Sequence, residues 1–451
     1  MIKLPVCFEK RMKDLLGEEF KSYTAALQKE PCRAFRVNTK KISLPDFEKI
    51  NPFGSERVPY VENGFHLEFD KVGNHPYHHA GMVYVQEPAA MAPAQCIEID
   101  PDWWVLDMCA APGGKSTQIA NKLGEKGVLV SNEIIPSRCK ILSGNIERLG
   151  LENVVVTCTD TAYLAKTFPK TFDLIMVDAP CSGEGMFRKE EAAVTEWSAE
   201  NVLKCAARQT EILENAARLL KNGGIIIYAT CTFSLEENEK TVDSFLQNHP
   251  DFEIVRPKEE IMAATESGIR FDGCLCSNIH YSRRFYPHKG RGEGQFMAVL
   301  KNKNEHSENV RIQKAPQKPD RLVTDFLDDV LTDYDISFVQ SVNGTPVYFT
   351  PEFDLKGIKP FLCGVTIGEI RKNYILPHHQ FFSALGEKFK RKICLSADDK
   401  RVMQFLRGEE IEAQCENGFA AVLVDGVALG GVKVVNGTAK NYYPKGLRLK
   451  V

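Results

Sequence analysis

Apolar and polar stretches alternate regularly in the middle of the chain, between about residues 100 and 302. Short apolar runs lie at Trp103–Met108, Gly127–Asn132, Val154–Thr159, Phe172–Val177, Gly224–Thr230 and Phe296–Leu300. Between them, apolar residues recur at helical spacing near 114–124, 136–149, 198–221 and 235–248. This order predicts βα units around a mostly parallel sheet, in which ligands bind beyond the carboxyl ends of the strands.

The segments on either side of this region follow other patterns. Residues 8–23 begin with an apolar stripe at helical spacing, formed by Phe8, Met12, Leu15, Leu16 and Phe20. A stretch rich in Pro, Gly and Asn continues to about residue 82 and predicts short strands and turns. Residues 301–321 hold few aliphatic side chains and many charges, as a linker does.

These patterns divide the chain into five predicted parts. They are an N-terminal region at 1–95, a central domain at 96–302, a linker at 303–321, a small mixed domain at 322–382 and a β-rich module at 383–451. From residue 433 onward the module carries five basic residues and no acidic one, beside Tyr442 and Tyr443. Basic residues interleaved with aromatic ones are typical of an RNA-binding surface. A solvated tail is the other interpretation of this feature.

Composition limits the class of protein. The chain has 451 residues, of which 43% are hydrophobic and 26% charged, as in globular proteins. Its net charge of −3 excludes a uniformly basic coat for nucleic acid, but not local basic faces. The sequence has no apolar run of a length that spans a bilayer and begins without the apolar stretch of a signal peptide, so no membrane contact is expected.

Cysteine and histidine usage points to a reduced compartment without bound metal. The 14 cysteines have irregular spacings and include no CxxC pair, so we expect free thiols in a cytoplasmic protein. Two histidine pairs occur, His78-His79 and His378-His379. Neither has carboxylates or cysteines at ligand spacing, so no metal site is predicted.

The strongest local motif is Asp107-Met-Cys-Ala-Ala-Pro-Gly-Gly-Lys-Ser-Thr117, between an apolar run and a helix. A phosphate loop would need glycine at position 109, which is Cys109, and the dinucleotide fingerprint also fails. What remains is an acid at a strand end, a turn of small residues and a helix N-terminus, which favours a carboxylate. The amino-acid part of S-adenosylmethionine carries such a group.

Acidic residues also follow the next two predicted strands. Glu133 is placed to hold ribose hydroxyls, and Asp160 is placed near an adenine amine. Each acid alone is more often a helix cap or a solvated strand end. Because three successive strands end in this way, the pattern favours a cofactor site.

Two cysteines follow adjacent central strands, Cys181 in Asp178-Ala-Pro-Cys-Ser-Gly183 and Cys231 in Thr230-Cys-Thr-Phe233. A lone cysteine is usually a small buried apolar residue, but two at the ligand-binding edge indicate thiol chemistry. A thiolate that adds to carbon 6 of cytosine makes carbon 5 nucleophilic enough to accept a methyl group. Asp178 would assist by donating a hydrogen bond to ring N3 if burial kept it protonated. Lys189, Arg188 and Asn38 are candidates for orienting the base or its phosphate.

The second cysteine would assist the last step, in which the carbon 5 proton leaves and the attacking thiol is expelled. The chemistry alone does not decide which of the two thiols is the nucleophile.

These motifs resemble the Nol–Nop–Sun family of RNA cytosine-5 methyltransferases. The resemblance rests on Phe172-Asp173 with Asp178-Ala-Pro-Cys-Ser-Gly183, on the loop 107–117 and on Thr230–Phe233. It extends to Arg36–Thr39 and 78–88 near the start, and to 284–296 at the end of the central domain. The C-terminal Asn441-Tyr-Tyr-Pro-Lys-Gly-Leu-Arg448 resembles the PUA-like module of the small-subunit rRNA methyltransferase F branch.

The resemblance implies a class I S-adenosylmethionine-dependent methyltransferase, an α/β protein with a Rossmann-like mixed sheet of about seven strands. An N-terminal α+β RNA-binding part and a C-terminal PUA-like β-rich module would flank it. It also implies Cys231 as the nucleophile, with Cys181 aiding release. The implied cofactor-binding residues are Cys109, Ala110, Ala111, Pro112, Gly113, Gly114, Lys115, Glu133, Arg138, Asp160 and Asp178.

The sequence therefore predicts a cytoplasmic, monomeric enzyme that makes 5-methylcytosine in RNA, with 16S rRNA of the small ribosomal subunit as the expected substrate. Two alternatives remain open. One is a cytosine-5 methyltransferase that acts on tRNA. The other is a non-catalytic RNA-binding factor of ribosome assembly that keeps the fold.

Overall fold

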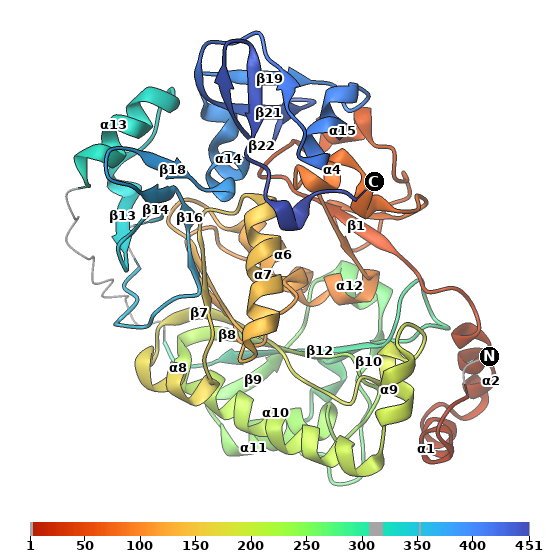
Figure 1. Cartoon of the computed structure of the whole chain (residues 1–451). Coiled ribbons are helices and arrows are strands. Elements are labelled where there is room, and N and C mark those ends of the chain that lie inside the picture. Colours follow the sequence, from red (N-terminus) through yellow and green to blue (C-terminus); the bar gives the residue numbers. More distant parts are fainter. Residues whose placement is uncertain (1–2, 306–318, 351–352, 451) are drawn as a thin grey trace.

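The computed structural model describes residues 3–305, 319–350 and 353–450. The predicted linker at 303–321 falls largely on residues 306–318, outside the described residues. Figure 1 shows a large α/β domain with the C-terminal modules above it and the first two helices of the chain at its lower right. No helix in the described ranges is long and apolar enough to cross a membrane.

The central sheet has the predicted mixed architecture. Its seven core strands are β4 (Trp104–Asp107), β5 (Val128–Asn132), β6 (Val154–Thr157), β7 (Phe172–Asp178), β8 (Leu220–Thr230), β9 (Phe252–Val255) and β12 (Gln295–Asn302). The strands β6, β5, β4, β7 and β8 are neighbours in that order and parallel, whereas β12 pairs antiparallel with both β8 and β9. Three short strands extend the sheet: β10 (Glu266–Ser267) and β11 (Arg283–Phe285) beside β12, and β15 (Leu362–Cys363) beside β6.

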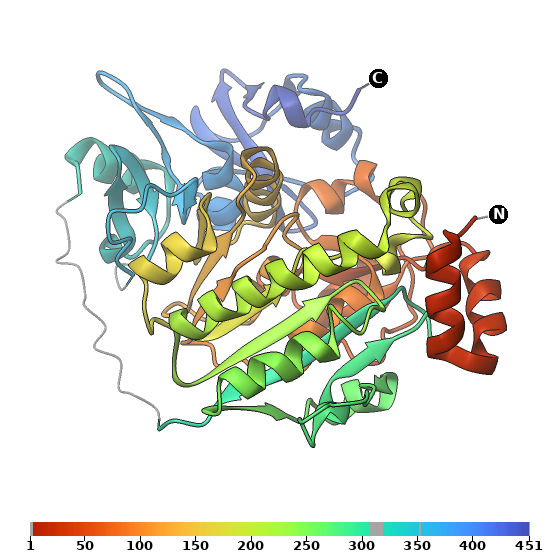
Figure 2. The same ribbon diagram turned by 90° about the horizontal axis from the view of Figure 1, so that it is seen from below.

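Helices cover both faces of this sheet. On one face lie α6 (Gly114–Lys122) and α7 (Pro136–Leu149), and on the other lie α8 (Thr161–Thr167), α10 (Ala199–Leu219) and α11 (Glu239–Asn248). Figure 2 shows the long α10 beside α11. The shorter α9 (Glu191–Glu196) and α12 (Glu259–Ala264) lie in the connections. Because apolar side chains on both sheet faces are buried under helices, the strand ends alone are left to form a site.

The first predicted helix is in fact two. Gly17, at a φ of 55°, ends α1 (Val6–Leu16), and α2 (Phe20–Leu27) starts after one 3₁₀ turn. We call α1 and α2 the N-terminal helix pair. Its apolar face packs on the central domain, where Phe8 and Tyr23 contact Phe187 and Phe233.

The rest of the N-terminal region is a small α+β unit. Its antiparallel sheet consists of β1 (Ala34–Val37), β2 (Gly64–His66) and β3 (Val83–Gln86), with the helices α3 (Leu44–Ile50), α4 (Pro76–His79) and α5 (Pro88–Met91).

The C-terminal part contains two further units. The first comprises α13 (Arg321–Val330), β13 (Val339–Val342), β14 (Thr345–Tyr348), β16 (Val365–Thr366), β17 (Gly368–Ile370) and β18 (Ile375–Pro377). The second is a five-stranded sheet of β19 (Lys392–Leu395), β20 (Ile411–Glu412), β21 (Gly418–Val424), β22 (Val427–Val435) and β23 (Thr438–Asn441), with α15 (Lys400–Arg407). The helix α14 (His379–Leu385) crosses the predicted boundary at 382/383 and packs on β22 and α7.

One hydrophobic core joins the N-terminal region to the C-terminal sheet. Phe35 and Phe47 of the former belong to the same buried cluster as Val422 and Phe405 of the latter. Two units far apart in sequence therefore stabilise each other directly, and both lie against α7 of the central domain.

Histidines lie at the junction of these three parts. His79 hydrogen-bonds the hydroxyl of Tyr443 (2.8 Å), and the ring of His379 packs against the same tyrosine. Burial lowers the pKa of His79 to about 4 and that of His379 to about 3. The folded protein therefore holds both imidazoles neutral at physiological pH.

Replacing His379 by Gln should weaken the pH dependence of stability. The unfolded chain takes up a proton on this residue below about pH 6.5, while the folded protein does not until about pH 3. The contribution of the neutral imidazole is thus complete above pH 6.5 and is lost as the pH falls. We expect the native free energy of unfolding to fall relative to that of His379→Gln by about 1.4 kcal/mol per pH unit between pH 6 and 5. Urea unfolding at each pH measures it.

Burial also raises the pKa of Glu147 to about 7, so this carboxyl titrates near the same pH. It does so in the native protein and in His379→Gln alike, and its effect cancels in the difference between their free energies of unfolding. His280→Gln, at an exposed histidine, is the matched control and should give a constant difference. A constant difference for His379→Gln as well would contradict the prediction.

Candidate active site

A cavity of about 690 Å³ lies beyond the carboxyl ends of β4, β5, β7 and β8. Of the predicted site residues, it is lined by Cys109, Ala111, Glu133, Arg138, Asp160, Asp178, Cys181 and Cys231. Ala110, Pro112, Gly113, Gly114 and Lys115 belong to the same loop and helix start but do not line it. The structure therefore brings together the two thiols with Glu133, Asp160 and Asp178, whereas Asp107 does not line the cavity.

Buried hydrogen bonds hold the loop after β4 in place. Asp107 is buried and accepts a hydrogen bond from Oγ of Ser116 (2.6 Å), and burial raises its pKa to about 7. The amide of Ala110 donates to the carbonyl of Asn132 on β5 (2.8 Å). Gly113, at a φ of 110°, turns the chain into α6, a backbone conformation that suits glycine. The turn of small residues thus brings Cys109 and Ala111 to the cavity, whereas Gly113 and Gly114 at the start of α6 do not line it.

Glu133 and Arg138 form the next wall. Oε2 of Glu133 lies 3.2 Å from Nη1 of Arg138, and Oε1 accepts from the amide of Ile135 (3.0 Å). Nη2 of Arg138 donates to the carbonyl of Ala111 (2.8 Å), which ties this wall to the first loop. Because Glu133 is almost completely buried, its orientation is fixed before any ligand binds.

Asp160 caps the helix α8 and also lines the cavity. Oδ1 accepts from the amide of Tyr163 (2.8 Å) and so caps α8, while the side chain also lines the cavity. Asn132, which sequence reasoning missed, accepts from Oγ1 of Thr157 (2.8 Å) and donates to the carbonyl of Thr159 (2.9 Å). A buried amide at a strand end has no periodic signal, so only the structure reveals that it fixes the turn before Asp160.

Asp178 forms an ion pair with Lys115, with Oδ2 and Nζ 2.7 Å apart. Burial of Lys115 opposes its charge, but the Asp178 carboxylate outweighs this and raises the pKa of the lysine. The Asp178 side chain is 35% exposed. Asp178 is therefore only partly buried and has a cationic partner, and its role at ring N3 stays a prediction.

The sulfur atoms of Cys181 and Cys231 lie 3.3 Å apart, and we call them the thiol pair. The hydrogen bond to Cys231 and burial together hold the pKa of Cys181 well above its ordinary value. Either sulfur can be the donor in this contact, and the raised pKa of Cys181 favours the proton on that residue. The roles of the two thiols as nucleophile and release group stay predictions.

The residues next to the thiol pair are in contact as well. Oγ of Ser182 and Oγ1 of Thr232 lie 2.9 Å apart, and both approach the buried carboxyl of Glu237. The amide of Gly185 donates to the carbonyl of Cys231 (2.8 Å). Glu237, Asn238 and Glu239 are buried, although a run of charged residues such as Glu236–Glu239 usually faces solvent and carries no sequence signal of burial.

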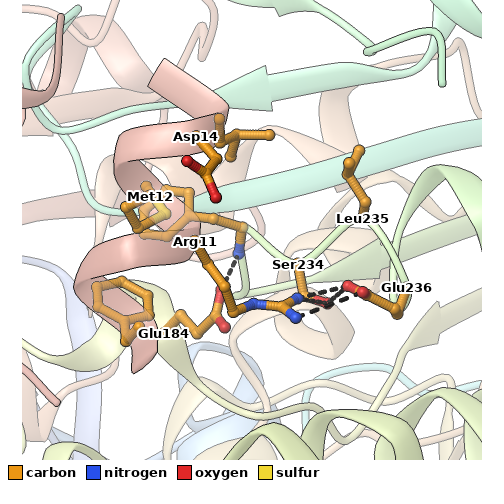
Figure 3. A pocket seen from close by; sticks show the side chains of 10 residues that line it. Arg11, Met12, Asp14, Glu184, Ser234, Leu235 and Glu236 are labelled. Carbon is orange, nitrogen blue, oxygen red and sulfur yellow. Dashed lines mark hydrogen bonds and ion pairs between the residues drawn. The ribbon is translucent and has the colours of Figure 1, made fainter. Parts of the chain in front are cut away.

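The N-terminal helix pair contacts the loop that follows Cys231 (Figure 3). Arg11 of α1 donates to Oε2 of Glu236 (2.5 Å) and to Oγ of Ser234 (3.4 Å) across a small cavity of about 240 Å³. Beside it, the buried Glu184 accepts from the amide of Phe233 (2.9 Å). The apolar stripe found in the sequence therefore supports the site directly.

Two candidates for contact with the base lie elsewhere. Arg188 is almost fully buried and donates to Glu293 through Nε and Nη2 (3.0 and 2.9 Å) and to the carbonyl of Ala26 (3.1 Å). Asn38 is buried and donates to the carbonyls of Gly81 and Leu149 (2.9 and 2.8 Å). Both join parts of the protein instead of facing the cavity, whereas Lys189 is exposed. In the described residues no group of three or more His, Cys, Asp or Glu side chains is arranged to hold a metal.

Three family models match successive parts of the chain. Residues 4–88 match the N-terminal domain of 16S rRNA methyltransferase RsmF, residues 94–301 match 16S rRNA methyltransferase RsmB/F, and residues 392–449 match the methyltransferase RsmF PUA domain. These matches cover the unit with the cavity and the units on either side of it.

Two proteins with related names are similar to this chain over nearly their whole length. The ribosomal RNA small subunit methyltransferase F of Vibrio vulnificus strain YJ016 is 30% identical, over 99% of this chain and 98% of that protein. The one of Aeromonas salmonicida strain A449 is 32% identical, over 94% and 92%. Among solved structures, a methyltransferase homologue from Pyrococcus horikoshii has 30% sequence identity to this chain. Its crystal structure matches with a TM-score of 0.60, over 67% of this chain and 96% of that chain.

Replacing Gly185 by Ala should separate the thiol pair. A Cβ at this position would lie 2.5 Å from the carbonyl oxygen of Gly294 and 3.0 Å from that of Cys231, so backbone must move. Since overpacking of this kind costs about 1–3 kcal/mol, we expect the yield of Cys181–Cys231 cross-link with the short thiol reagent dibromobimane to fall by roughly tenfold. Mass spectrometry of the joined peptides measures it.

Gly144→Ala is the matched control, because a Cβ there would meet open space on α7. It should leave the cross-link yield unchanged. Equal yields in both variants would show that Gly185 does not set the separation of the sulfurs.

Proposed function

We propose that this chain, which belongs to the family of small-subunit ribosomal RNA methyltransferases F, methylates carbon 5 of a cytosine in 16S rRNA through a covalent bond to Cys231. The observation that carries the mechanism is the thiol pair, 3.3 Å apart, at the wall of the cofactor cavity. Methylation of a carbon activated by thiolate addition needs a nucleophilic sulfur and the methyl donor at one place.

The cavity fits S-adenosylmethionine, the methyl donor of the family. The backbone turn at Ala111 and the start of α6 suit its carboxylate, Glu133 suits the ribose hydroxyls, and the second oxygen of Asp160 suits the adenine amine. Bound there, S-adenosylmethionine supplies an electrophilic methyl group. Every other group that the reaction requires belongs to the protein.

Cys231 begins the reaction by adding to carbon 6 of the cytosine. Negative charge then develops on the base, and N3 takes up a proton. Lys115 supplies that proton through Asp178: Asp178 takes it from Nζ of Lys115 and passes it to N3. The ring is thereby converted into a neutral enamine whose carbon 5 is nucleophilic.

Cys181 completes the reaction. Once Cys231 is bound to carbon 6, it no longer carries the charge that held the proton on Cys181, so Cys181 releases that proton to solvent, which is the net proton that the reaction produces. Its thiolate removes the carbon 5 proton, the electron pair forms the C5–C6 double bond, and the bond from carbon 6 to sulfur breaks. Cys231 leaves as a thiolate, N3 returns its proton to the Asp178–Lys115 pair, and the starting state is restored.

The flanking units serve to present the base. A cytosine must be unstacked to reach the cavity wall, and the N-terminal region and the PUA domain are suited to hold RNA by its shape and backbone. All groups of the site come from one chain, which supports a monomeric enzyme. Ribosomal RNA as substrate supports a cytoplasmic location.

Replacing the two cysteines should have opposite effects on the covalent intermediate. Cys231→Ala should abolish turnover and form no adduct, because no sulfur reaches carbon 6. Cys181→Ala should methylate the base once and remain bound to the RNA, because release lacks its base. Denaturing gel electrophoresis with labelled RNA detects the adduct, and loss of methylation without an adduct in Cys181→Ala would refute the release role.

Bisulfite sequencing of RNA from a strain lacking the gene tests the substrate. One signal in 16S rRNA should disappear, and the native protein but not Cys231→Ser should restore it. A signal that moves to tRNA would leave the mechanism intact and assign another substrate. No change in any cytosine would favour a non-catalytic assembly factor.

Asp160→Asn should weaken cofactor binding without loss of stability. Asparagine caps a helix as well as aspartate does, so α8 keeps its contact to the amide of Tyr163. Its NH₂ group cannot accept from the adenine amine, and loss of one such contact costs about tenfold in affinity. Calorimetric titration with S-adenosylmethionine gives the affinity, and thermal unfolding checks the cap. Unchanged affinity would remove Asp160 from the adenine site.

A further inference from the structure

A buried carboxyl that the reaction does not use lies behind the thiol pair. Glu237 has no exposed surface, and its side-chain contacts are with neutral groups. Oε2 accepts from the amide of Ser182 and from Nε2 of Gln209, both at 2.9 Å, and Oε1 lies 2.5 Å from Oγ of Ser182. Gln209 also donates to the carbonyl of Pro180 (3.0 Å). Glu237 therefore fixes the residues on both sides of Cys181.

The next residue does the same for the other thiol. Oδ1 of Asn238 accepts from Oγ1 of Thr230 (2.6 Å), and its Nδ2 donates to the carbonyl of Thr232 (3.0 Å). These are the two neighbours of Cys231. The contact between Ser182 and Thr232 then joins the two halves.

A buried ion pair fixes the segment 237–239. Glu239 and Arg284 are both completely or almost completely buried, and Nε of Arg284 donates to Oε1 of Glu239 (2.6 Å). Nη1 of Arg284 donates to the carbonyl of Phe233 (2.9 Å), so the loop after Cys231 is closed onto the start of α11. Residues 237–239 are thus a rigid support for both thiols.

We propose that Glu237 and Asn238 are the positioning residues of the thiol pair, and that the negative charge of Glu237 keeps the proton on Cys181 and so leaves Cys231 as the nucleophile. The inference rests on the proposed roles of the two thiols. Glu237 touches neither sulfur, so it acts through Ser182 and through its field. The hydrogen bond to Cys231, burial and the charge of Cys231 raise the pKa of Cys181 most, and the field of Glu237 adds to them.

The charged and titratable groups around Glu237 come from each element packed against it. They are Arg11 of α1, Glu184 after β7, Cys205 of α10, Tyr228 of β8 and Cys181 itself. Arg11 is paired with Glu236, so the nearest cation is already neutralised. Burial raises the pKa of Glu237 to about 7. Its negative charge, and with it the effect on Cys181, is therefore present above that pH and lost below it.

The test is Glu237→Gln, which keeps the shape and removes the charge. Iodoacetamide alkylates thiolates, and peptide mass spectrometry follows Cys181 and Cys231 separately across pH in the full-length protein. We expect the alkylation midpoint of Cys181 to fall by about one pH unit, a roughly tenfold faster reaction at a fixed pH, with Cys231 little changed. Glu253→Gln, at an exposed glutamate of β9, is the matched control and should not move Cys181.

A second variant tests the other half independently. Asn238→Asp keeps the acceptor for Thr230 and adds a charge beside Cys231, so the midpoint of Cys231, not that of Cys181, should rise. If Glu237→Gln moves the midpoint of Cys181 no further than Glu253→Gln does, or moves both thiols equally, the proposed effect of the Glu237 charge is overturned. If Glu237→Gln leaves the alkylation midpoint of Cys181 unchanged and Asn238→Asp leaves that of Cys231 unchanged, the positioning role is overturned as well.

Catalysis provides a second readout. In methyl transfer to 16S rRNA, Glu237→Gln should lower kcat and leave KM for RNA unchanged, because no RNA-facing surface is altered. A raised KM with unchanged kcat would contradict the inference. Since alkylation requires neither RNA nor methyl transfer, its outcome is separate from a failure of the proposed reaction.

Discussion

The parallel pairing of β7 with β8 is the constraint on which the site depends. Asp178 lies opposite Ala229 in this register, so the chain leaves both strands at the same level of the sheet. Cys181 follows three residues after Asp178 and Cys231 two residues after Ala229, which brings the sulfurs within 3.3 Å. A shift of one residue in the register would turn each side chain to the other face of the sheet and separate the loops.

This geometry brings polar groups into the interior, where each needs a partner. Lys115 has Asp178, Arg284 has Glu239, and the two hydroxyls of Ser182 and Thr232 have each other. A buried network whose members are all satisfied specifies one arrangement, whereas loss of a single partner leaves an unpaired group at a cost of about 1–3 kcal/mol. Precision at the thiols thus depends on residues that never meet a substrate.

Strand order and strand-end chemistry are predictable from the sequence because they follow local rules. Apolar runs place Glu133 and Asp160 at one edge, and small residues after Asp107 indicate a tight turn. Contacts over long separations are not predictable in this way. Nothing in the pattern around Arg188 shows that Glu293 lies beside it, and nothing in the charges of Glu237 and Glu239 shows that they are buried.

The position of the N-terminal helix pair has a consequence for the order in which the protein is made. Arg11 and its partner Glu236 are 225 residues apart in the chain. The strand β12, which pairs with β8 and β9, is complete only at Asn302. The apolar side chains of α1 and α2 pack on residues that follow much later, such as Phe187 and Phe233, so they are covered only after that part has been synthesised. The support that the helix pair gives to the loop after Cys231 is therefore among the contacts that form late.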